Sequence, residues 1–549
     1  MKSVLQIHES DNVWVALKDL YQGEALRING TTVKLNFNIP AKHKVAIKDL
    51  KKSDEVFMYG IKVGEALRDI NKGDLISTEN VRHAVVPYGV EDFETTYDWQ
   101  KPDVSKWKDR TFMGYHRQNG KVGTANYWLV IPLVFCENRN VSVLEKAFRE
   151  VFGSGKDNLF ANYLLHLCDT HNGGGENGGF NNDDLSATLP RYHNYFENVS
   201  GIQFLKHQMG CGGTRDDAAT LTGLLAGYIA HPNVAGATIL SLGCQNVQKE
   251  MITEQVQKRM NGGEKPFYFF EQQKFQSSEK MLLEAIETTF NGMAEANQIT
   301  RQPAPLSELV LGMECGGSDG FSGISANPVV GGVSDRMVAL GGGVILSEFP
   351  ELSGVEQNLI KRCVNEKVAR RFIELIHSYE KNAIAVGSGF DSNPSAGNIK
   401  DGLITDAIKS AGAALKGGQS PIKDVLDYPE MVKEKGLTLL CTPGNDVEST
   451  TAMAGSGATL ILFTTGLGTP TGNPITPVIK ISSNTHIYNK LNDIIDFNTG
   501  EVIEGTKGID ELADDLLEMV IAAASGEYLP KAVSLEQNDF IPWKRGVSL

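Results

Sequence analysis

Cysteine and long apolar runs are both scarce in this sequence of 549 residues. The seven cysteines are odd in number and scattered, unlike a disulfide framework, so we expect reduced thiols and a cytoplasmic protein. No window approaches about 18 uninterrupted apolar residues, the length that a membrane span needs. The opening segment, MKSVLQIHESDNVW, becomes polar too soon for the apolar core of a signal peptide. The sequence therefore predicts neither membrane spans nor disulfides.

Clusters of positive charge are also missing. Lysine and arginine total 52 against 67 aspartates and glutamates, a net charge of −15, and no long basic run occurs. Nucleic acids and anionic membranes are poor partners for such a chain, because phosphate contacts need clustered lysine and arginine. A composition of 41% hydrophobic and 22% charged residues is that of a globular protein, and the length implies several domains.

The pattern along the chain predicts an α/β protein that begins with a small all-β module. Short β-rich runs separated by turns fill residues 1–88, and an acidic, aromatic and proline-containing stretch at 89–108 is typical of a linker. Apolar strand-like runs then alternate with helical ones, which predicts a middle α/β domain at 109–300 and a C-terminal Rossmann-like parallel-sheet domain at 301–549. The Gly- and Asn-rich stretch 153–200 is predicted to be an insertion, either a lid or a surface excursion.

Four polar segments follow predicted strands, where parallel α/β folds bind their ligands. Each combines potential ligands or acid–base groups with glycines that permit close backbone approach. The segments are KHQMGCGGTRDD (206–217), SLGCQN (241–246), MECGGSDGFSGISANP (313–328) and CTPGNDVESTTAMAGSGATLILFTTGLGTPTGNP (441–474).

Three cysteines in these segments lie beside glycine after a strand, namely Cys211, Cys244 and Cys315. This pattern leaves ligation and simple packing equally open for them, since a buried cysteine often behaves as a small hydrophobe. His207, four residues before Cys211, is a candidate ligand or proton-transfer group. The other four cysteines lack the pattern and are assigned to packing: Cys136, Cys168, Cys363 and Cys441.

A nucleotide site is disfavoured. Gly466 and Gly468 follow a predicted strand, as in a dinucleotide fold, but Pro470, Pro474 and Pro477 crowd the place where the phosphate-binding helix would begin. No Gly-Lys-Ser/Thr motif appears either. NAD and NTP chemistry are therefore set aside.

The four segments resemble the altronate/galactarate dehydratase family, as does GYHRQNGKVGTANYWLVIP (114–132). Near the N-terminus, HESDNVWVALKDL, IPAKHKVAIKDLKKSDEVFMYG and VGEALRDINKGDLIS resemble the SAF domain, a β-clip fold. The resemblance covers nearly the whole chain and is strongest to the altronate-acting members. It implies a hydro-lyase that converts D-altronate to 2-dehydro-3-deoxy-D-gluconate and water. Alternatives are another aldarate substrate, such as galactarate, and a non-catalytic sugar-acid-binding homologue.

The resemblance also implies iron(II), with manganese(II) as the alternative, a small anionic sugar-acid ligand and a homodimer. A divalent cation would stabilise the enediolate that forms when C2 loses its proton, and acid–base groups would move the protons. Expected proton-transfer groups are His207, Cys211 and Cys315; expected metal ligands are Glu314, Asp319, Cys244 and His43; expected substrate contacts are Ser318, Asn327, Asn445, Asp446 and Thr465. A competing hypothesis is an iron–sulfur cluster on Cys211, Cys244 and Cys315.

Overall fold

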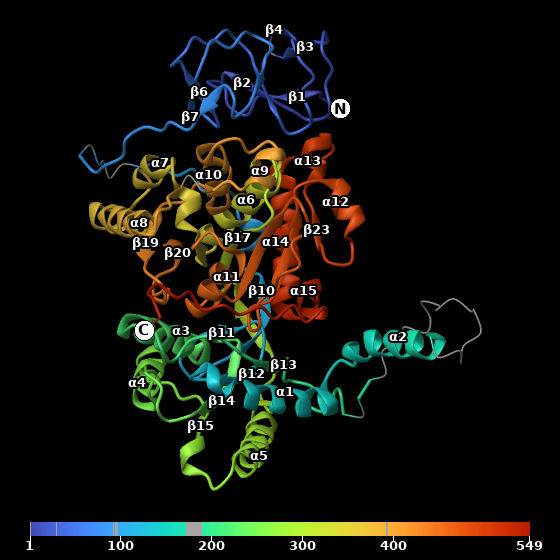
Figure 1. Cartoon of the computed structure of the whole chain (residues 1–549), viewed down its shortest axis with the longest axis vertical. Helices are drawn as coiled ribbons and strands as arrows, with labels where there is room; N and C mark the ends of the chain where they lie inside the picture. The colour runs from blue at the N-terminus through green and yellow to red at the C-terminus, as the bar shows by residue number, and fades with distance from the viewer. Residues whose placement is uncertain are drawn as a thin grey trace. The chain divides into compact units, whose positions relative to one another are not determined.

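The computed structural model describes residues 2–28, 30–91, 93, 97–171, 189–190, 192–390 and 393–548. The chain divides into two compact units. Unit 1 comprises residues 1–125, 223–233 and 301–545, and unit 2 comprises residues 126–222, 234–300 and 546–549. Figure 1 colours the chain from blue at the N-terminus to red at the C-terminus. Among the described helices, none is long and apolar enough to cross a membrane.

The N-terminal part of unit 1 is an all-β module, as predicted. Its short antiparallel strands form three sheets, of order β1-β2-β5-β8, β3-β4 and β6-β7-β9. The strands are β1 (Val4–Leu5), β2 (Val13–Ala16), β3 (Ala25–Ile28), β4 (Thr31–Lys34), β5 (Lys44–Ala46), β6 (Glu55–Met58), β7 (Ile61–Ala66), β8 (Leu75–Ile76) and β9 (Val81–Arg82). Apolar side chains of this module share one buried cluster with Phe321, Ile324 and Ile408, so the module packs against the C-terminal part of the same unit.

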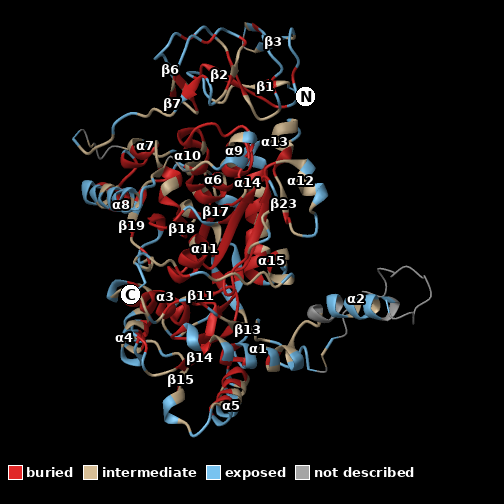
Figure 2. Ribbon diagram, in the orientation of Figure 1, coloured by how far each residue is buried: buried red, intermediate tan, exposed pale blue. Residues whose placement is uncertain are grey.

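The C-terminal part of unit 1 contains a seven-stranded sheet of order β19-β20-β18-β17-β21-β22-β23, in which all strand pairs are parallel. Its strands are β17 (Val310–Cys315), β18 (Gly343–Leu346), β19 (Ile422–Leu426), β20 (Gly436–Leu440), β21 (Leu460–Thr465), β22 (Val478–Ser482) and β23 (Phe497–Asn498). The central strands are buried along nearly their whole length, which explains their continuous apolar sequence (Figure 2).

Helices and short 3-10 turns connect these strands. They are η5 (Leu306–Glu308), η6 (Ser322–Ile324), α6 (Ala326–Ala339), η7 (Phe349–Leu352), α7 (Glu356–Ile360), α8 (Glu366–Ala385), α9 (Ala396–Lys400), α10 (Asp406–Ala414), η9 (Leu415–Gly417), α11 (Asp446–Gly455), α12 (Thr485–Lys490), α13 (Gly500–Glu504), α14 (Ile509–Ser525) and α15 (Lys531–Ser534). The segment 356–385 forms two helices, α7 and α8, because Asn365 caps α8 by accepting a hydrogen bond from the Val368 N–H. Arg336 on α6 pairs with Asp514 on α14 at 2.8 Å.

A small antiparallel sheet completes unit 1, of order β11-β10-β16, with β10 (Thr111–His116), β11 (Val122–Gly123) and β16 (Gln302–Pro305). The 3-10 turn η1 (Ser105–Trp107) precedes it.

Unit 2 is built on a parallel sheet of order β13-β12-β14-β15. Its elements are β12 (Tyr127–Pro132), η2 (Phe135–Glu137), α1 (Asn138–Phe152), α2 (Lys156–His171), β13 (Gly201–Phe204), α3 (Arg215–Ala230), β14 (Val234–Ser241), α4 (Lys249–Met260), β15 (Phe267–Glu271), η4 (Gln272–Lys274) and α5 (Ser278–Ala296); the second half of α3 belongs to unit 1.

The α/β class and the parallel sheets are confirmed. A Rossmann-like strand order is not confirmed for the C-terminal domain, because β20 lies between β19 and β18, which differs from the Rossmann order. The predicted insertion at 153–200 begins just after α1 and includes all of α2, and its residues 172–188 and 191 lie outside the described part of the chain.

Candidate functional site

The seven-stranded sheet has a topological switch point between β17 and β21. From β17 the chain builds β18, β20 and β19 on one side, and then crosses to build β21, β22 and β23 on the other. In open parallel sheets, ligands bind beyond the carboxyl ends of the strands at such a point. Glu314 and Cys315 end β17 there.

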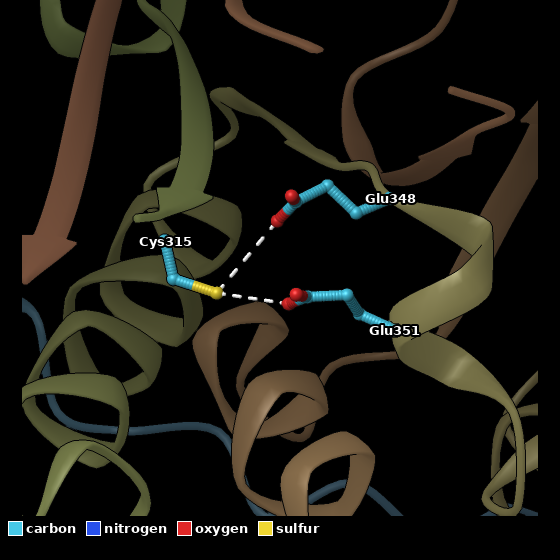
Figure 3. A group of neighbouring side chains, drawn as sticks. All are labelled: Cys315, Glu348 and Glu351. Atoms are coloured by element: carbon cyan, nitrogen blue, oxygen red, sulfur yellow. Dashed lines mark hydrogen bonds between the residues drawn. The ribbon is translucent and has the colours of Figure 1, made fainter. Parts of the chain in front are cut away.

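A buried cluster of acids surrounds the end of β17 (Figure 3). The Cys315 thiol lies 3.0 Å from an oxygen of Glu351 and 3.7 Å from an oxygen of Glu348, and the three side chains point toward one another. Both glutamates follow β18, in and just before η7, and they are almost completely buried. Because β17 and β18 pair in parallel, their carboxyl ends bring Cys315 and Glu348 together.

Two lysines enter the same cluster from the region of α10. Lys416 Nζ donates to Cys315 Sγ at 2.6 Å and pairs with Glu348 at 3.2 Å, and Lys409 Nζ pairs with Glu351 at 2.6 Å. We call the seven residues Glu314, Cys315, Glu348, Glu351, Lys409, Lys416 and Asp446 the acid–lysine cluster. Its four carboxyl groups outnumber its two ammonium groups.

Burial and charge shift the acid–base behaviour of this cluster. Burial, followed by the charge of Glu351, raises the pKa of the Cys315 thiol well above its usual value, so the thiol stays protonated and donates to Glu351. Burial alone would lower the pKa of Lys416, but the groups of Cys315, Glu348 and Glu351 around it hold that pKa well above its usual value. Lys416 is therefore an ammonium.

The two glutamates after β18 differ in their acid–base behaviour. Burial, followed by the charge of Glu351, raises the pKa of Glu348 to about 7. Burial would raise the pKa of Glu351 as well, but the ammonium groups of Lys409 and Lys416 lower it to about 2. Glu351 is thus an anion held between two cations.

Glu314 is fully buried, and burial followed by the charge of Glu348 raises its pKa well above the usual value. One of its oxygens accepts a hydrogen bond from Ser449 Oγ at 2.6 Å. Its Oε1 and the Oε1 of Glu348 accept no hydrogen bond from an N–H or hydroxyl group in the part of the chain that the structure describes. The Glu314 and Glu348 carboxyl groups hydrogen-bond to each other, which requires a proton on one of them. A cation that displaces this proton would bind between the two carboxylates.

Two sets of side chains in the described residues bring three potential metal ligands within 4.8 Å of one another. One is Glu314, Glu348 and Asp446, and the other is Cys315, Glu348 and Glu351. The first set is all oxygen, holds the Glu314–Glu348 carboxyl pair and is therefore the better fit to a hard divalent cation. In the second set, Lys416 and Lys409 already neutralise the donors.

Two backbone features shape this site. A side-chain carbon on Gly316 would lie 2.0 Å from Asp446 Oδ2, so only glycine lets the start of α11 approach the end of β17. Glu348 has φ 66° and ψ 64°, the left-handed region that non-glycine residues rarely adopt. Such strain is found where a side chain must be aimed at a site, and here it aims Glu348 at Lys416.

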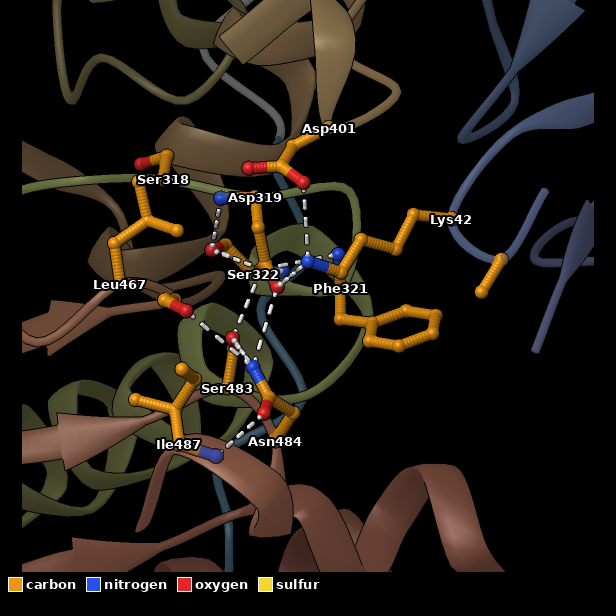
Figure 4. Close-up of polar contacts among 12 residues, drawn as sticks. Lys42, Ser318, Asp319, Phe321, Ser322, Asp401, Leu467, Ser483, Asn484 and Ile487 are labelled. Carbon is orange, nitrogen blue, oxygen red and sulfur yellow. Dashed lines mark hydrogen bonds and ion pairs between the residues drawn. The ribbon is translucent and has the colours of Figure 1, made fainter. Parts of the chain in front are cut away.

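Asp319 lies in a separate polar neighbourhood that joins the N-terminal module to the loop after β17 (Figure 4). It is fully buried, and one of its oxygens accepts from Ser322 Oγ at 2.9 Å and Ser483 Oγ at 2.8 Å. Its other oxygen pairs with Lys42 Nζ at 3.0 Å and accepts from Asn484 at 3.3 Å. Both oxygens of Asp319 are thus occupied by donors from this chain.

The expected substrate contacts have different surroundings. Asp446 belongs to the acid–lysine cluster and, with the exposed Asn445 before it, marks where the cluster meets the surface. Asn445 also caps α11. Asn327 and Thr465 already have partners: Thr464 donates to Asn327 at 2.8 Å, and Thr465 Oγ1 accepts from the Gly468 N–H at 2.9 Å. Ser318 is buried, and its carbonyl accepts from Asn398 at 2.8 Å.

Three other expected residues belong to unit 2. His207 is buried, with Nε2 2.7 Å from the Pro132 carbonyl and Nδ1 accepting from the Met209 N–H at 3.1 Å. Burial lowers the pKa of His207 to about 4. Cys211 and Cys244 are exposed. The roles of these three residues stay predictions.

His43 lies in the N-terminal module, where its Nδ1 is 3.1 Å from the Ala41 carbonyl. Its metal ligation, like that of Asp319 and Cys244, stays a prediction. Among the cysteines assigned to packing, Cys363 and Cys441 are buried as expected. Cys136 and Cys168 are exposed, so their assignment to packing is wrong.

Sequence reasoning missed four members of the acid–lysine cluster: Glu348, Glu351, Lys409 and Lys416. A signal for the first two is present, since SEFPEL (347–352) follows the apolar run of β18 as the polar segments follow their strands. No comparable signal marks the lysines, which come from the α10–η9 segment.

Comparison with known proteins covers nearly the whole chain. Residues 2–84 match the altronate/galactarate dehydratase SAF domain, residues 114–297 match the second domain of D-galactarate dehydratase/altronate hydrolase, and residues 306–548 match the C-terminal domain of D-galactarate/altronate dehydratase. The N-terminal β module is therefore a SAF domain.

The similar proteins of known function include altronate dehydratases and a galactarate dehydratase. The chain is 34% identical over its full length to altronate dehydratase of Bacillus subtilis (strain 168), covering 100% of that protein. It is 32% identical to altronate dehydratase of Escherichia coli (strain K12), over 99% of both chains. It is 30% identical to galactarate dehydratase (L-threo-forming) of the same E. coli strain, over 95% of this chain and 93% of that protein. The chain belongs to the altronate/galactarate dehydratase family and is a sugar-acid dehydratase, a hydro-lyase.

Proposed function

We propose that this protein is an altronate dehydratase, which converts D-altronate to 2-dehydro-3-deoxy-D-gluconate and water. The two altronate dehydratases that it resembles over its full length support the choice of substrate. The observation that carries the chemistry is the acid–lysine cluster, in which buried carboxyl groups face two ammonium groups at the switch point of a parallel sheet.

The reaction requires charge stabilisation next to proton transfer. The C2 proton of a sugar acid is very weakly acidic, because its removal adds charge beside a carboxylate that is already anionic. A site for this reaction needs positive groups near the substrate carboxylate, a base for the C2 proton and an acid for the departing C3 hydroxyl. The acid–lysine cluster contains all three kinds of group in a water-poor environment.

We propose that Glu314, Glu348 and Asp446 hold a divalent cation, iron(II) or manganese(II). Support comes from the hydrogen bond between Glu314 and Glu348, where a cation can replace the proton, and from the excess of carboxyl groups over ammonium groups. A bound cation of this kind acts as a Lewis acid toward a carboxylate and its neighbouring hydroxyl. Ser449 Oγ donates a hydrogen bond of 2.6 Å to Glu314 Oε2, and this bond holds the carboxylate in one orientation.

The lysines and Cys315 take the remaining roles in this proposal. Lys416 supplies a fixed positive charge, since its ammonium is buried and is held by Glu348 and Cys315. Cys315 Sγ lies between Lys416 Nζ and Glu351; it accepts a hydrogen bond from the ammonium and donates one to the carboxylate, so it holds these two charged groups in position. Lys409 keeps Glu351 in its anionic form. Asn445 and Asp446, where the cluster reaches the surface, bind the hydroxyl groups of the sugar acid.

The test is turnover under anaerobic conditions with iron(II) or manganese(II). D-altronate, galactarate and D-gluconate are supplied separately, and the 2-keto-3-deoxy acid is assayed. We expect kcat/KM for D-altronate to exceed that for galactarate by at least about tenfold, a discrimination of about 1.4 kcal/mol. A preference for galactarate would overturn the substrate, and ligand-induced thermal stabilisation without product from any of the acids would overturn catalysis. Light scattering of the same sample tests the expected homodimer.

A further inference from the structure

Three cysteines emerge at one edge of the parallel sheet of unit 2. Cys136 follows β12, Cys211 follows β13 and Cys244 follows β14, and these three strands are neighbours in the order β13-β12-β14. Because the strands are parallel, their carboxyl ends meet at the same edge. Residues from 33 to 108 positions apart are thereby brought to one place. We call these three residues the thiol edge.

Backbone hydrogen bonds join the three loops of the thiol edge. The Phe135 N–H donates to the Met209 carbonyl at 3.0 Å, and the Asn246 N–H donates to the Gly210 carbonyl at 3.0 Å. Each bonded residue lies within two positions of a cysteine of the thiol edge. The loop of Cys211 is therefore clamped between the loops of Cys136 and Cys244.

The buried His207 side chain holds the loops of Cys136 and Cys211 together. Its ring bridges the Pro132 carbonyl, at the end of β12, and the Met209 N–H, two residues before Cys211. Asn138 donates to the His207 carbonyl at 2.8 Å and begins α1, just after Cys136. A buried polar network of this kind holds loops in one conformation. His207 is a positioning residue for the thiol edge.

The surroundings of the thiol edge suit an anionic, thiophilic group. All three cysteines are free and exposed, unlike the buried Cys315, Cys363 and Cys441. A helix begins within five residues after each of them, at Asn138, Arg215 and Lys249. Helix N-termini favour negative charge, and soft thiolates favour zinc or iron–sulfur clusters over hard cations.

We propose that Cys136, Cys211 and Cys244 hold an iron–sulfur cluster with three protein thiolates, which leaves one iron of a four-iron cluster without a cysteine ligand. Each thiol releases its proton to solvent as its sulfur binds iron. The proposal does not depend on the identity of the sugar acid. It replaces Cys315 in the competing cluster hypothesis with Cys136, since Cys315 Sγ is engaged by Lys416 and Glu351.

The spacing of the sulfur atoms argues against a single zinc ion at the thiol edge. Zinc–sulfur bonds of about 2.3 Å in a tetrahedron bring sulfur atoms to within about 4 Å of one another. In the described residues, the sets of metal-binding atoms that lie within 4.8 Å of one another do not include these cysteines. The thiolates of a four-iron cluster bind different corners of a larger body and stand further apart.

The test is reconstitution of the anaerobically purified full-length protein with equal amounts of ferrous and ferric iron and with sulfide, which together supply the two ferrous and two ferric ions of a four-iron cluster. Iron and acid-labile sulfide per chain, visible absorption and the electron paramagnetic resonance spectrum of the reduced protein are measured. The variants are C136S, C211S and C244S, with C168S, an exposed cysteine of α2, as the matched control. C315S separates the two cluster hypotheses, and circular dichroism verifies that each variant is folded.

We expect wild type, C168S and C315S to bind iron and sulfide in about equal amounts and to show sulfide-to-iron charge transfer in the visible. Each variant of the thiol edge should lose at least half of the bound sulfide and change the resonance spectrum. Binding of iron without sulfide, unchanged clusters in the three variants, or loss of the cluster in C315S would overturn the proposal. None of these readouts depends on turnover, so failure of the proposed function would be recognised separately.

Discussion

Lys416 Nζ donates a hydrogen bond of 2.6 Å to Cys315 Sγ across 101 residues of sequence. The lysine is 1% exposed, and its other close partner is Glu348. A buried ammonium contributes little net stability when it is paired, but removal of one partner leaves an uncompensated charge. This contact therefore links the integrity of the fold to the electrostatics of the site.

The first prediction concerns this buried pair. Lys416→Met should lower the free energy of unfolding by about 3 kcal/mol, because Glu348 and Glu351 then lose a buried counter-charge. Urea unfolding of Lys416→Met, Glu348→Gln and the double variant forms a double-mutant cycle. The two changes should couple by at least about 1 kcal/mol, and strict additivity would contradict a direct interaction.

A second prediction separates metal binding from stability at Glu314. Glu314→Gln keeps the shape of the side chain but cannot ionise to bind a cation. Without metal, we expect the variant to be more stable than wild type by about 1 kcal/mol, since the raised pKa means that Glu314 must take up a proton as the chain folds, which costs free energy at neutral pH. With manganese(II), its affinity should fall at least tenfold in calorimetry. Glu284→Gln, at an exposed position of α5, is the control that should change neither quantity.

Gly316 provides a steric prediction. Gly316→Ala places a carbon 2.0 Å from Asp446 Oδ2 and 2.6 Å from Phe463, so the start of α11 must move away. We expect at least a tenfold loss of manganese(II) affinity and of kcat/KM. Gly508→Ala is the matched control, because nothing lies within 4 Å of its added carbon and its backbone needs no glycine. Equal behaviour of the two variants would contradict the proposed role of Asp446.

The fourth prediction concerns pH and His207. The folded-state pKa of about 4 lies below the ordinary value of 6.5, so the unfolded chain binds more protons between these values. The stabilising contribution is complete above pH 6.5 and is lost as pH falls toward 4, by at most about 3 kcal/mol. Urea unfolding at pH 7.5, 6.0 and 5.0 should show this slope in wild type and a flatter one in His207→Asn. His193→Asn, at an exposed position, should keep the wild-type slope.

A fifth prediction concerns the contact of the SAF domain with the loop after β17. Asp319→Ala leaves several buried donors without an acceptor, including Ser322 and Ser483, and should cost about 3 kcal/mol of unfolding free energy. Lys42→Met removes one partly exposed partner and should cost about 1 kcal/mol. Thermal unfolding checks the order of the two variants, and a larger effect of Lys42→Met would contradict the central role of Asp319.

The sequence predicted where strands end, but it did not predict which strands would be neighbours in the sheet. Glu314 and Cys315 were recognisable because an apolar run ends in a polar, glycine-rich segment, and β17 does end at Cys315. That Glu348 would face Cys315 depends on β18 pairing beside β17, and strand order is a property of the whole sheet. Lys416 reaches the site only after a series of helices has returned the chain to it, so no local pattern could have revealed it.

The assignment of Cys136 to packing was wrong for a related reason. Cys211 and Cys244 have glycine neighbours that mark them as candidates, whereas Cys136 stands in PLVFCENRN without them. Its place beside the other two follows from β12 being the middle strand of β13-β12-β14. Local composition therefore selected two of the three exposed cysteines at that edge.

The left-handed backbone of Glu348 has a consequence for how this protein would respond to selection. Glycine at this position would relax the backbone and remove one of the excess carboxyl groups, while Glu351 would still offset the charge of Lys416, so a screen that rewards only heat resistance would favour the loss of Glu348. A screen that rewards turnover would keep it. Libraries of this chain selected for stability alone should accumulate inactive proteins first at this residue.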